Sequence, residues 1–150
     1  MYEHLLVPVD DSELSDKAIE TSVGLAKLLG ASITGFTVEP PLPPMVMEPA
    51  AMAMAYTAVT IQDHQASCEA HARKVLKRFA DRAVEAGVPF DGQFMVTEGI
   101  QQAIVDIAER QHCDLIVMGS HGRHGLDALI HGSLTKSVLS HSKLPLLIIH

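Results

Sequence analysis

One run near the end of the chain has glycines and hydroxyl side chains at a spacing that suits phosphate binding. From Gly119 to Ser133 the pattern is Gly-x2-Gly, then nine residues, then Gly-Ser. Glycine lets the backbone approach a ligand closely, and the free N–H groups at the start of a helix hold phosphate oxygens. No Gly-Lys-Ser/Thr follows the glycines, so the run is not a P-loop. The spacing therefore predicts an anion-binding loop that lacks the lysine of P-loop enzymes.

The elements on either side of this loop are a strand and a helix. Residues Asp114–Met118 form a short apolar stretch that is typical of a buried parallel strand. The segment Ser133–Leu139 begins with a hydroxyl residue and continues as a helix. A strand, a glycine-rich turn and a helix amino terminus together form a natural anion site.

The remaining chain alternates apolar strands with longer helical segments. We expect further strands at His4–Val9, Ser32–Val38, Phe90–Thr97 and Leu144–Ile149, and helices at Ser12–Gly30, at Ile61–Ala86 and from Ile100. This alternation predicts an α/β fold with an open, doubly wound, parallel sheet of five strands. Right-handed crossovers make the first and fourth strands neighbours, so Asp10 and Gly119 are predicted to share one crevice.

Composition narrows the class of protein. The chain has 150 residues, of which 47% are hydrophobic and 19% charged, and we expect residues 1–150 to form one domain. A net charge of -7 without a basic stripe argues against nucleic acid as a partner. No apolar run approaches the ~20 residues of a membrane span, and no signal peptide is visible. The two cysteines, Cys68 and Cys113, do not suggest a disulfide framework, which favours a cytoplasmic location.

The glycine loop resembles the nucleotide-binding signature of the universal stress protein family, in its ATP-binding branch. The match is complete at the four defining positions Gly119, Gly122, Gly132 and Ser133, and the resemblance covers nearly the whole chain apart from Glu39–Thr60. It implies a Rossmann-like fold of the adenine nucleotide alpha hydrolase type, with the five strands in the order 3-2-1-4-5. It also implies a cytoplasmic, nucleotide-sensing stress-response protein that binds ATP, or AMP or ADP, with Mg²⁺.

The predicted binding residues combine loop chemistry with this resemblance. Gly119 and Gly122 would let backbone amides approach ribose and phosphates, Gly132 and the Ser133 N–H would meet the phosphate chain, and the Ser133 and Thr135 hydroxyls would donate to it. The resemblance implies that Asp10 holds ribose hydroxyls or a metal, that Val38 offers backbone bonds to adenine, and that Pro8, Val9, Met118 and Leu134 line the pocket. Taken alone, Val38 and Met118 are ordinary core residues, and Asp10 could serve helix capping only.

Two charged residues near the loop have opposite effects on a bound triphosphate. Arg123 is the only cation within the loop, and it is either a phosphate partner or a solvated side chain. Asp11 departs from the small residue that family members often carry after the first-strand aspartate. A second carboxylate there repels a triphosphate unless Mg²⁺ or Arg123 balances it. His121, His124 and His131 sit in or near the loop, so we hypothesise that their protonation makes the nucleotide affinity pH-sensitive.

Two further features have competing interpretations. His64, Cys68 and His71 share one helical face and are residue types that bind Zn²⁺, but no fourth ligand is visible, and ordinary surface or interface histidines are the alternative. The Pro- and Met-rich region Glu39–Thr60 is a lid, an oligomer contact, a mobile flap or a variable insertion.

Catalytic patterns are missing from the sequence. There is no Gly-x-Ser-x-Gly elbow and no recognisable Ser/His/Asp or Cys/His arrangement, so we expect at most slow ATP hydrolysis.

The uncharged last strand, Leu144–Ile149, favours pairing with another strand at a sheet edge, and the resemblance implies a homodimer through it. The alternatives to a nucleotide sensor are a nucleotide-independent interaction protein and a weak ATPase.

Overall fold

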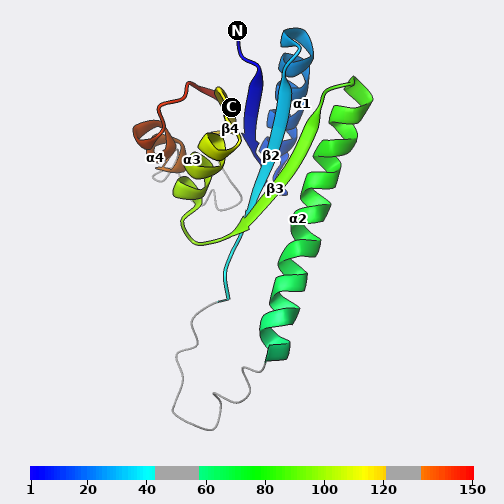
Figure 1. The fold of residues 1–150 in the computed structure, drawn as a ribbon, viewed down its shortest axis with the longest axis vertical. Helices are drawn as coiled ribbons and strands as arrows, with labels where there is room; N and C mark the ends of the chain where they lie inside the picture. The colour runs from blue at the N-terminus through cyan, green and yellow to red at the C-terminus, as the bar shows by residue number, and fades with distance from the viewer. Residues whose placement is uncertain (43–57, 121–132) are drawn as a thin grey trace.

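The computed structural model of the chain describes residues 1–42, 58–120 and 133–150 (Figure 1). Strands and helices alternate along it, as the sequence predicts. The elements are β1 (His4–Pro8), α1 (Glu13–Leu29), β2 (Ser32–Glu39), α2 (Ala58–Ala86), β3 (Phe90–Val96), α3 (Ile100–Arg110), β4 (Leu115–Gly119), α4 (Ser133–His141) and β5 (Leu146–Ile149). Within the described ranges, no helix is both long and apolar enough to cross a membrane.

The five strands form one parallel sheet in the order β3-β2-β1-β4-β5, which confirms the predicted order. The direction in which strands are added reverses between β1 and β4. At the amino ends, Asp114 ties these two strands together, because its carboxylate accepts hydrogen bonds from the backbone N–H groups of Glu3 (2.7 Å) and His4 (3.1 Å). The pairing of β1 with β4 covers only Leu5 with Leu115 and Leu6 with Ile116.

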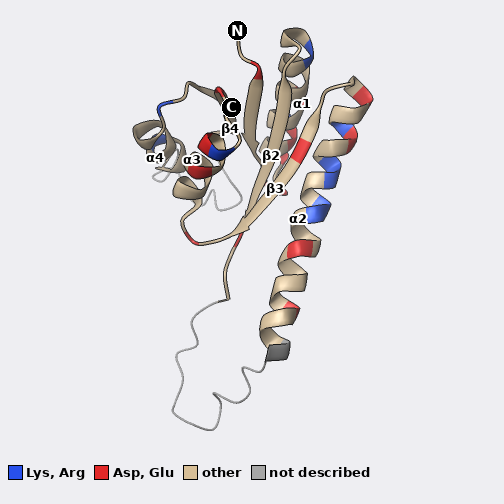
Figure 2. Cartoon of the chain, in the orientation of Figure 1, with Lys and Arg blue, Asp and Glu red and all other residues tan. Residues whose placement is uncertain are grey.

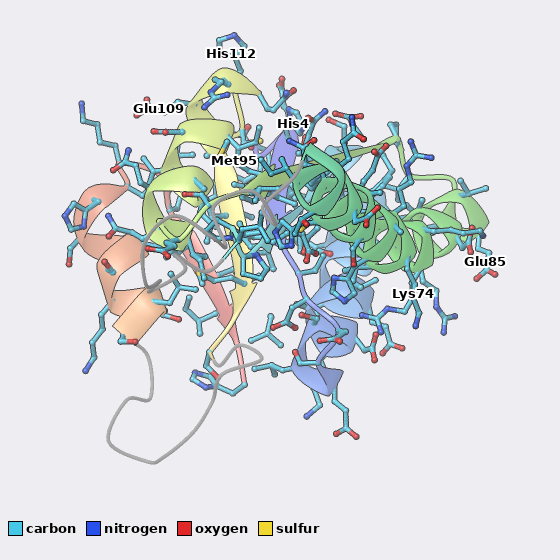
Figure 3. All side chains as sticks on the ribbon, turned by 90° about the horizontal axis from the view of Figure 1, so that it is seen from below. His4, Lys74, Glu85, Met95, Glu109 and His112 are labelled. Carbon is cyan, nitrogen blue, oxygen red and sulfur yellow. The ribbon has the colours of Figure 1, made fainter. Side chains whose placement is uncertain are left out.

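Helices cover both faces of the sheet. Figure 1 and Figure 3 show α1 and α2 on one face and α3 and α4 on the other. Each face buries its own apolar cluster, because successive strand residues point to opposite faces. The α1/α2 side includes Leu5, Val7, Ile19, Phe79 and Val117. The α3/α4 side includes Leu6, Phe36, Ile104, Ile116 and Val138.

Local signals account for several element boundaries. The Ser12 hydroxyl accepts a hydrogen bond from the Ser15 N–H at 3.2 Å, and Gly30 ends α1 in the left-handed region at φ 67°, as the sequence predicts. The predicted start of the last strand at Leu144 is wrong by two residues, since β5 begins at Leu146. Pro145 has no N–H to donate to a ladder, although its carbonyl accepts from the Ile116 N–H at 3.0 Å.

Candidate functional site

The candidate site lies at the carboxyl edge of the sheet, where β1 and β4 separate. The Val9 N–H donates to the Phe36 carbonyl of β2 at 2.8 Å, whereas the Ser120 N–H donates to the Ile149 carbonyl of β5 at 2.8 Å. Beyond their short paired region, the end of β1 therefore bonds to β2 and the end of β4 bonds to β5, so that the two central strands separate. In open parallel sheets, a reversal of this kind is where ligands bind. Figure 3 looks onto this edge, from below in the view of Figure 1.

Asp10 is held firmly at this edge by the start of α1. Its Oδ1 atom accepts hydrogen bonds from the Ser15 hydroxyl (2.6 Å), the Ser12 N–H (3.0 Å) and the Ser12 hydroxyl. The Asp10 N–H in turn donates to the Ser15 hydroxyl at 2.8 Å. Ser12 is the N-cap of α1, and Asp10 supports this cap through the Ser12 N–H and hydroxyl rather than capping the helix itself. The same bonds fix the orientation of the carboxylate next to the reversal point.

The other predicted residues on the β1 and β2 side lie along the same edge. Pro8 ends β1 half-buried, and Val9 is buried just beyond it. Val38 is half-buried near the end of β2, where it pairs with Met95 of β3 and packs against the cluster on the α3/α4 side. Pro8, Val9, Asp10 and Val38 thus follow the carboxyl ends of two adjacent strands.

The β4 side contributes apolar side chains and hydroxyl groups. Met118 is buried in the cluster on the α3/α4 side, and Leu134 of α4 packs against that cluster. Gly119 ends β4 and pairs with Ile149. Ser133 is the exposed first residue of α4, and Thr135 is half-buried one residue beyond Leu134. The predicted residues Gly122, Arg123 and Gly132 lie outside the described residues, as do the loop histidines.

Residues of α2 also lie at this edge, a contact that the sequence-based predictions do not include. His64, His71 and Arg78 are spaced seven residues apart and form one polar stripe along α2. The Arg78 guanidinium donates to the Asp10 carbonyl at 3.0 Å and lies 3.2 Å from the Asp16 carboxylate. His64 Nε2 is 3.1 Å from the Pro40 carbonyl oxygen. A polar repeat of seven on a helix that packs on a sheet was the signal available in the sequence.

His71 lies at the centre of this α2 polar stripe. Its Nδ1 atom is 2.6 Å from Oε1 of Glu39, and its Nε2 atom is 3.7 Å from Oδ2 of Asp11. Glu39 is the last residue of β2 and is buried, whereas Asp11 follows Asp10 and its carboxylate is exposed. One imidazole therefore faces carboxylates from the ends of two adjacent strands.

The zinc hypothesis for His64, Cys68 and His71 gains no support from this geometry. In the described ranges, no three His, Cys, Asp or Glu side chains are grouped so that they could hold a metal ion. His64 Nε2 and Cys68 Sγ are 3.3 Å apart, but His71 is engaged with Glu39 instead. Burial raises the pKa of the Cys68 thiol, and the nearby charge of Glu39 raises it further, which disfavours the thiolate that metals require.

Charges elsewhere on α2 are largely paired. Figure 2 shows its lysines and arginines gathered in the second half of the helix. Lys77 bonds to Asp81 at 2.6 Å, and Arg73 pairs with Glu69. A shallow groove between α1 and α2 is lined by Asp16, Ile19, Glu20, Arg78 and Arg82. Because two acids and two bases line it, this groove has no charge bias toward an anion.

The sequence and the fold match known proteins over nearly the whole of this chain. The model of the universal stress protein family matches residues 1–150. A universal stress protein of Methanocaldococcus jannaschii is 27% identical, with 99% of this chain and 82% of that protein covered. The solved structure of the universal stress protein UspA from Lactobacillus plantarum has a TM-score of 0.80 at 21% identity and covers 99% of this chain and 98% of that chain.

Some solved structures with this fold hold an adenine nucleotide. The universal stress protein from Archaeoglobus fulgidus in complex with dAMP has a TM-score of 0.65 at 16% identity, covering 99% of this chain and 98% of that chain. Two others were solved with cAMP and with AMP bound. At these identities the likeness of the structures shows the fold, while the family model extends from the first residue to the last. The chain belongs to the universal stress protein family.

Proposed function

We propose that this protein is a nucleotide-sensing stress-response protein that binds an adenine nucleotide at the carboxyl edge between β1 and β4. The observation that carries the proposal is the separation of these two strands beside a fixed Asp10 carboxylate. A ligand at such a reversal point reaches the ends of both strands and the start of the following helix. The cAMP, dAMP and AMP bound to proteins of the same fold support this ligand class.

The proposed contacts divide between the two sides of the reversal. On the β1 and β2 side, Asp10 would hold ribose hydroxyls or Mg²⁺, and Val38 would offer its backbone to adenine, with Pro8 and Val9 as pocket wall. On the β4 side, the proposed phosphate contacts are Gly119, Gly122, Arg123, Gly132, Ser133 and Thr135, with Met118 and Leu134 as pocket wall. ATP is the proposed ligand, with AMP and ADP as the other members of its class.

We further propose that residues 1–150 act as one cytoplasmic domain that forms a homodimer through β5. This strand lies at an edge of the sheet, where its outer backbone groups are available for pairing. Leu147 is 36% exposed although its neighbours Leu146 and Ile148 pack toward the core. Sedimentation of the purified protein, with and without nucleotide, measures the assembly directly, and a monomer at all concentrations contradicts the dimer.

Titration calorimetry with ATP and AMP, each with and without Mg²⁺, tests the proposed ligand class. Replacement of Gly122 and Gly132 by Val should reduce the affinity at least about tenfold, because a side chain keeps the backbone from approaching the phosphates. Gly24→Val is the matched control, since Gly24 is exposed on α1 and an added Cβ there meets nothing within 4 Å. Unchanged affinity in the double variant contradicts the site. No binding to the unaltered protein leaves the nucleotide-independent interaction protein as the function.

A further inference from the structure

A hydrogen bond joins α3 and α4, two helices that both begin at the carboxyl edge of the parallel sheet. The Ser137 hydroxyl donates to Oε1 of Gln101 at 2.6 Å, and both residues are half-buried. Gln101 is the second residue of α3, and Ser137 lies one turn into α4. Figure 1 shows the two helices side by side on their face of the sheet. The bond therefore links the start of α4 to a helix that begins after β3, on the other side of the reversal.

Packing by itself defines the orientation of α4 only loosely. The helix has nine residues, of which Val138 is buried, while Leu134, four residues earlier, packs against the same cluster. Apolar contact is non-directional, so this narrow stripe holds α4 against the sheet but resists rotation about the helix axis only weakly. A hydrogen bond, in contrast, depends on direction. The bond from Ser137 therefore fixes which face of α4 turns toward α3.

The orientation of α4 matters for the residues that are proposed to bind phosphate. Ser133 and Ser137 are four residues apart, so they lie on one face of the helix. Ser133 is also the first residue of α4, where backbone N–H groups have no partner within the helix. Such groups hold phosphate oxygens only while they point toward them. A rotation of α4 would therefore misdirect the phosphate contacts while leaving the β1 and β2 side of the site in place.

We propose that Gln101 and Ser137 are positioning residues for the phosphates of a bound nucleotide. This inference rests on the proposed nucleotide site. Their hydrogen bond holds the start of α4 in the orientation in which Ser133 and Thr135 meet the phosphate chain. Loss of the bond weakens the contacts to phosphate and spares the contacts to the base and the ribose.

Titration calorimetry of the full chain with ATP, AMP and adenosine tests this role. Ser137→Ala removes the donor, and Gln101→Met removes the acceptor at nearly constant size. Each variant should lower the ATP affinity by about twofold to fivefold, the range that one hydrogen bond between neutral groups can supply. AMP should lose no more than ATP, and adenosine nothing, because it has no phosphate. Ser137→Thr keeps the hydroxyl and should bind ATP like the unaltered protein.

Matched controls lie close to both residues. Gln102 follows Gln101, but its side-chain amide donates to Asp106 within α3 at 2.7 Å. The Ser140 hydroxyl donates to the Lys136 carbonyl within α4 at 2.8 Å. Gln102→Met and Ser140→Ala therefore remove similar bonds without changing the one between the helices. Both controls should leave all three affinities unchanged.

The double variant Gln101→Met with Ser137→Ala separates the shared bond from its two side chains. If the residues act through that bond, the double variant should lose no more ATP affinity than either single variant. Additive losses overturn the proposal, because they show that the two side chains act independently. This comparison also decides the question if adenosine binds too weakly to be measured. If Ser137→Ala does not fold, Gln101→Met against its control Gln102→Met decides it instead.

The outcomes separate this inference from the proposed function. If the unaltered protein binds none of the three ligands, the proposed function is wrong and the inference falls with it. If ATP binds equally well to the unaltered protein and to both single variants, the role of the bond is wrong while the site stands. Equal losses for ATP and adenosine also overturn the role, because they indicate a general loosening of the structure rather than misdirected phosphate contacts.

Discussion

The two sides of the reversal point are built in different ways. On the β1 side, Asp10 is oriented by hydroxyl groups of α1 and by the α2 polar stripe, which reaches it through Arg78. On the β4 side, Met118 belongs to an apolar cluster, and Leu134 packs against that cluster. The first side is positioned by charge and hydrogen bonds and the second mainly by packing. Perturbations of charge and of volume should therefore act on different sides of one site.

The largest effect should come from removing volume on the β4 side. Met118→Ala deletes a side chain that is 4% exposed, and we expect it to lower the free energy of unfolding by about 2–5 kcal/mol. Leu139→Ala on α4 is the control, because that side chain is 61% exposed and should change stability by less than about 0.5 kcal/mol. Urea unfolding measures both. A loss below about 1 kcal/mol for Met118→Ala would show that packing does not position this side.

The sequence predicts some features of this site and not others. The helix boundaries at Ser12 and Gly30 follow from patterns that are local in the chain. The right-handedness of crossovers then places Asp10 and Gly119 at one edge of the sheet. The contact of His71 with Glu39 and Asp11 joins residues far apart in sequence. It depends on the position of α2 relative to the carboxyl ends of β1 and β2. Periodicity shows which residues share a helix face but does not show what that face meets.

The predicted start of the last strand shows the same limit at a smaller scale. An uncharged apolar run marks a strand, but pairing is decided residue by residue by which backbone groups can join the ladder. Pro145 accepts a hydrogen bond and cannot donate one, and the Leu144 N–H donates to the Ser142 hydroxyl at 3.0 Å instead. The strand consequently begins after the proline.

An intermediate effect should appear on the α3/α4 side at alkaline pH. Burial raises the pKa of the Cys113 thiol from 9.0 to about 11. In the unfolded chain the thiol therefore loses its proton at lower pH than in the folded protein, so its contribution to stability is present below about pH 9 and is lost as pH rises toward 11. The upper limit of that loss is about 2–3 kcal/mol.

Comparison with Cys113→Ala isolates this contribution. The variant should be less stable at every pH because of the lost volume, but its unfolding free energy should fall less steeply between pH 9 and pH 11. Urea unfolding at four pH values between 8 and 11 measures the two slopes. Parallel slopes would mean that Cys113 ionises as readily in the folded protein as in the unfolded chain. Groups common to both proteins, lysines and tyrosines among them, contribute equally to each slope.

The smallest effect should come from removing charge on the β1 side. Arg78→Met keeps most of the aliphatic stem that lies between α1 and α2, but it removes the bond to the Asp10 carbonyl and the ion pair with Asp16. The Arg78 side chain is 38% exposed, and its Nε atom is buried without a hydrogen-bond partner in the described part of the chain. Solvent screening and this unsatisfied atom both reduce the contribution of Arg78 to stability, so we expect Arg78→Met to lower the free energy of unfolding by about 1 kcal/mol.

Arg82→Met is the matched control, because Arg82 follows one helical turn later and, among the residues that the structure describes, pairs with Glu85 alone, at 3.7 Å. It should change the free energy of unfolding by less than about 0.5 kcal/mol. Raising the salt concentration should shrink the difference between Arg78→Met and the unaltered protein, whereas the loss in Met118→Ala should persist. If both losses respond equally to salt, the two sides of the site are not positioned by different forces. A salt response confined to Arg78→Met would show that the β1 side depends on charge, and that α2 takes part in holding the aspartate from which the site is built.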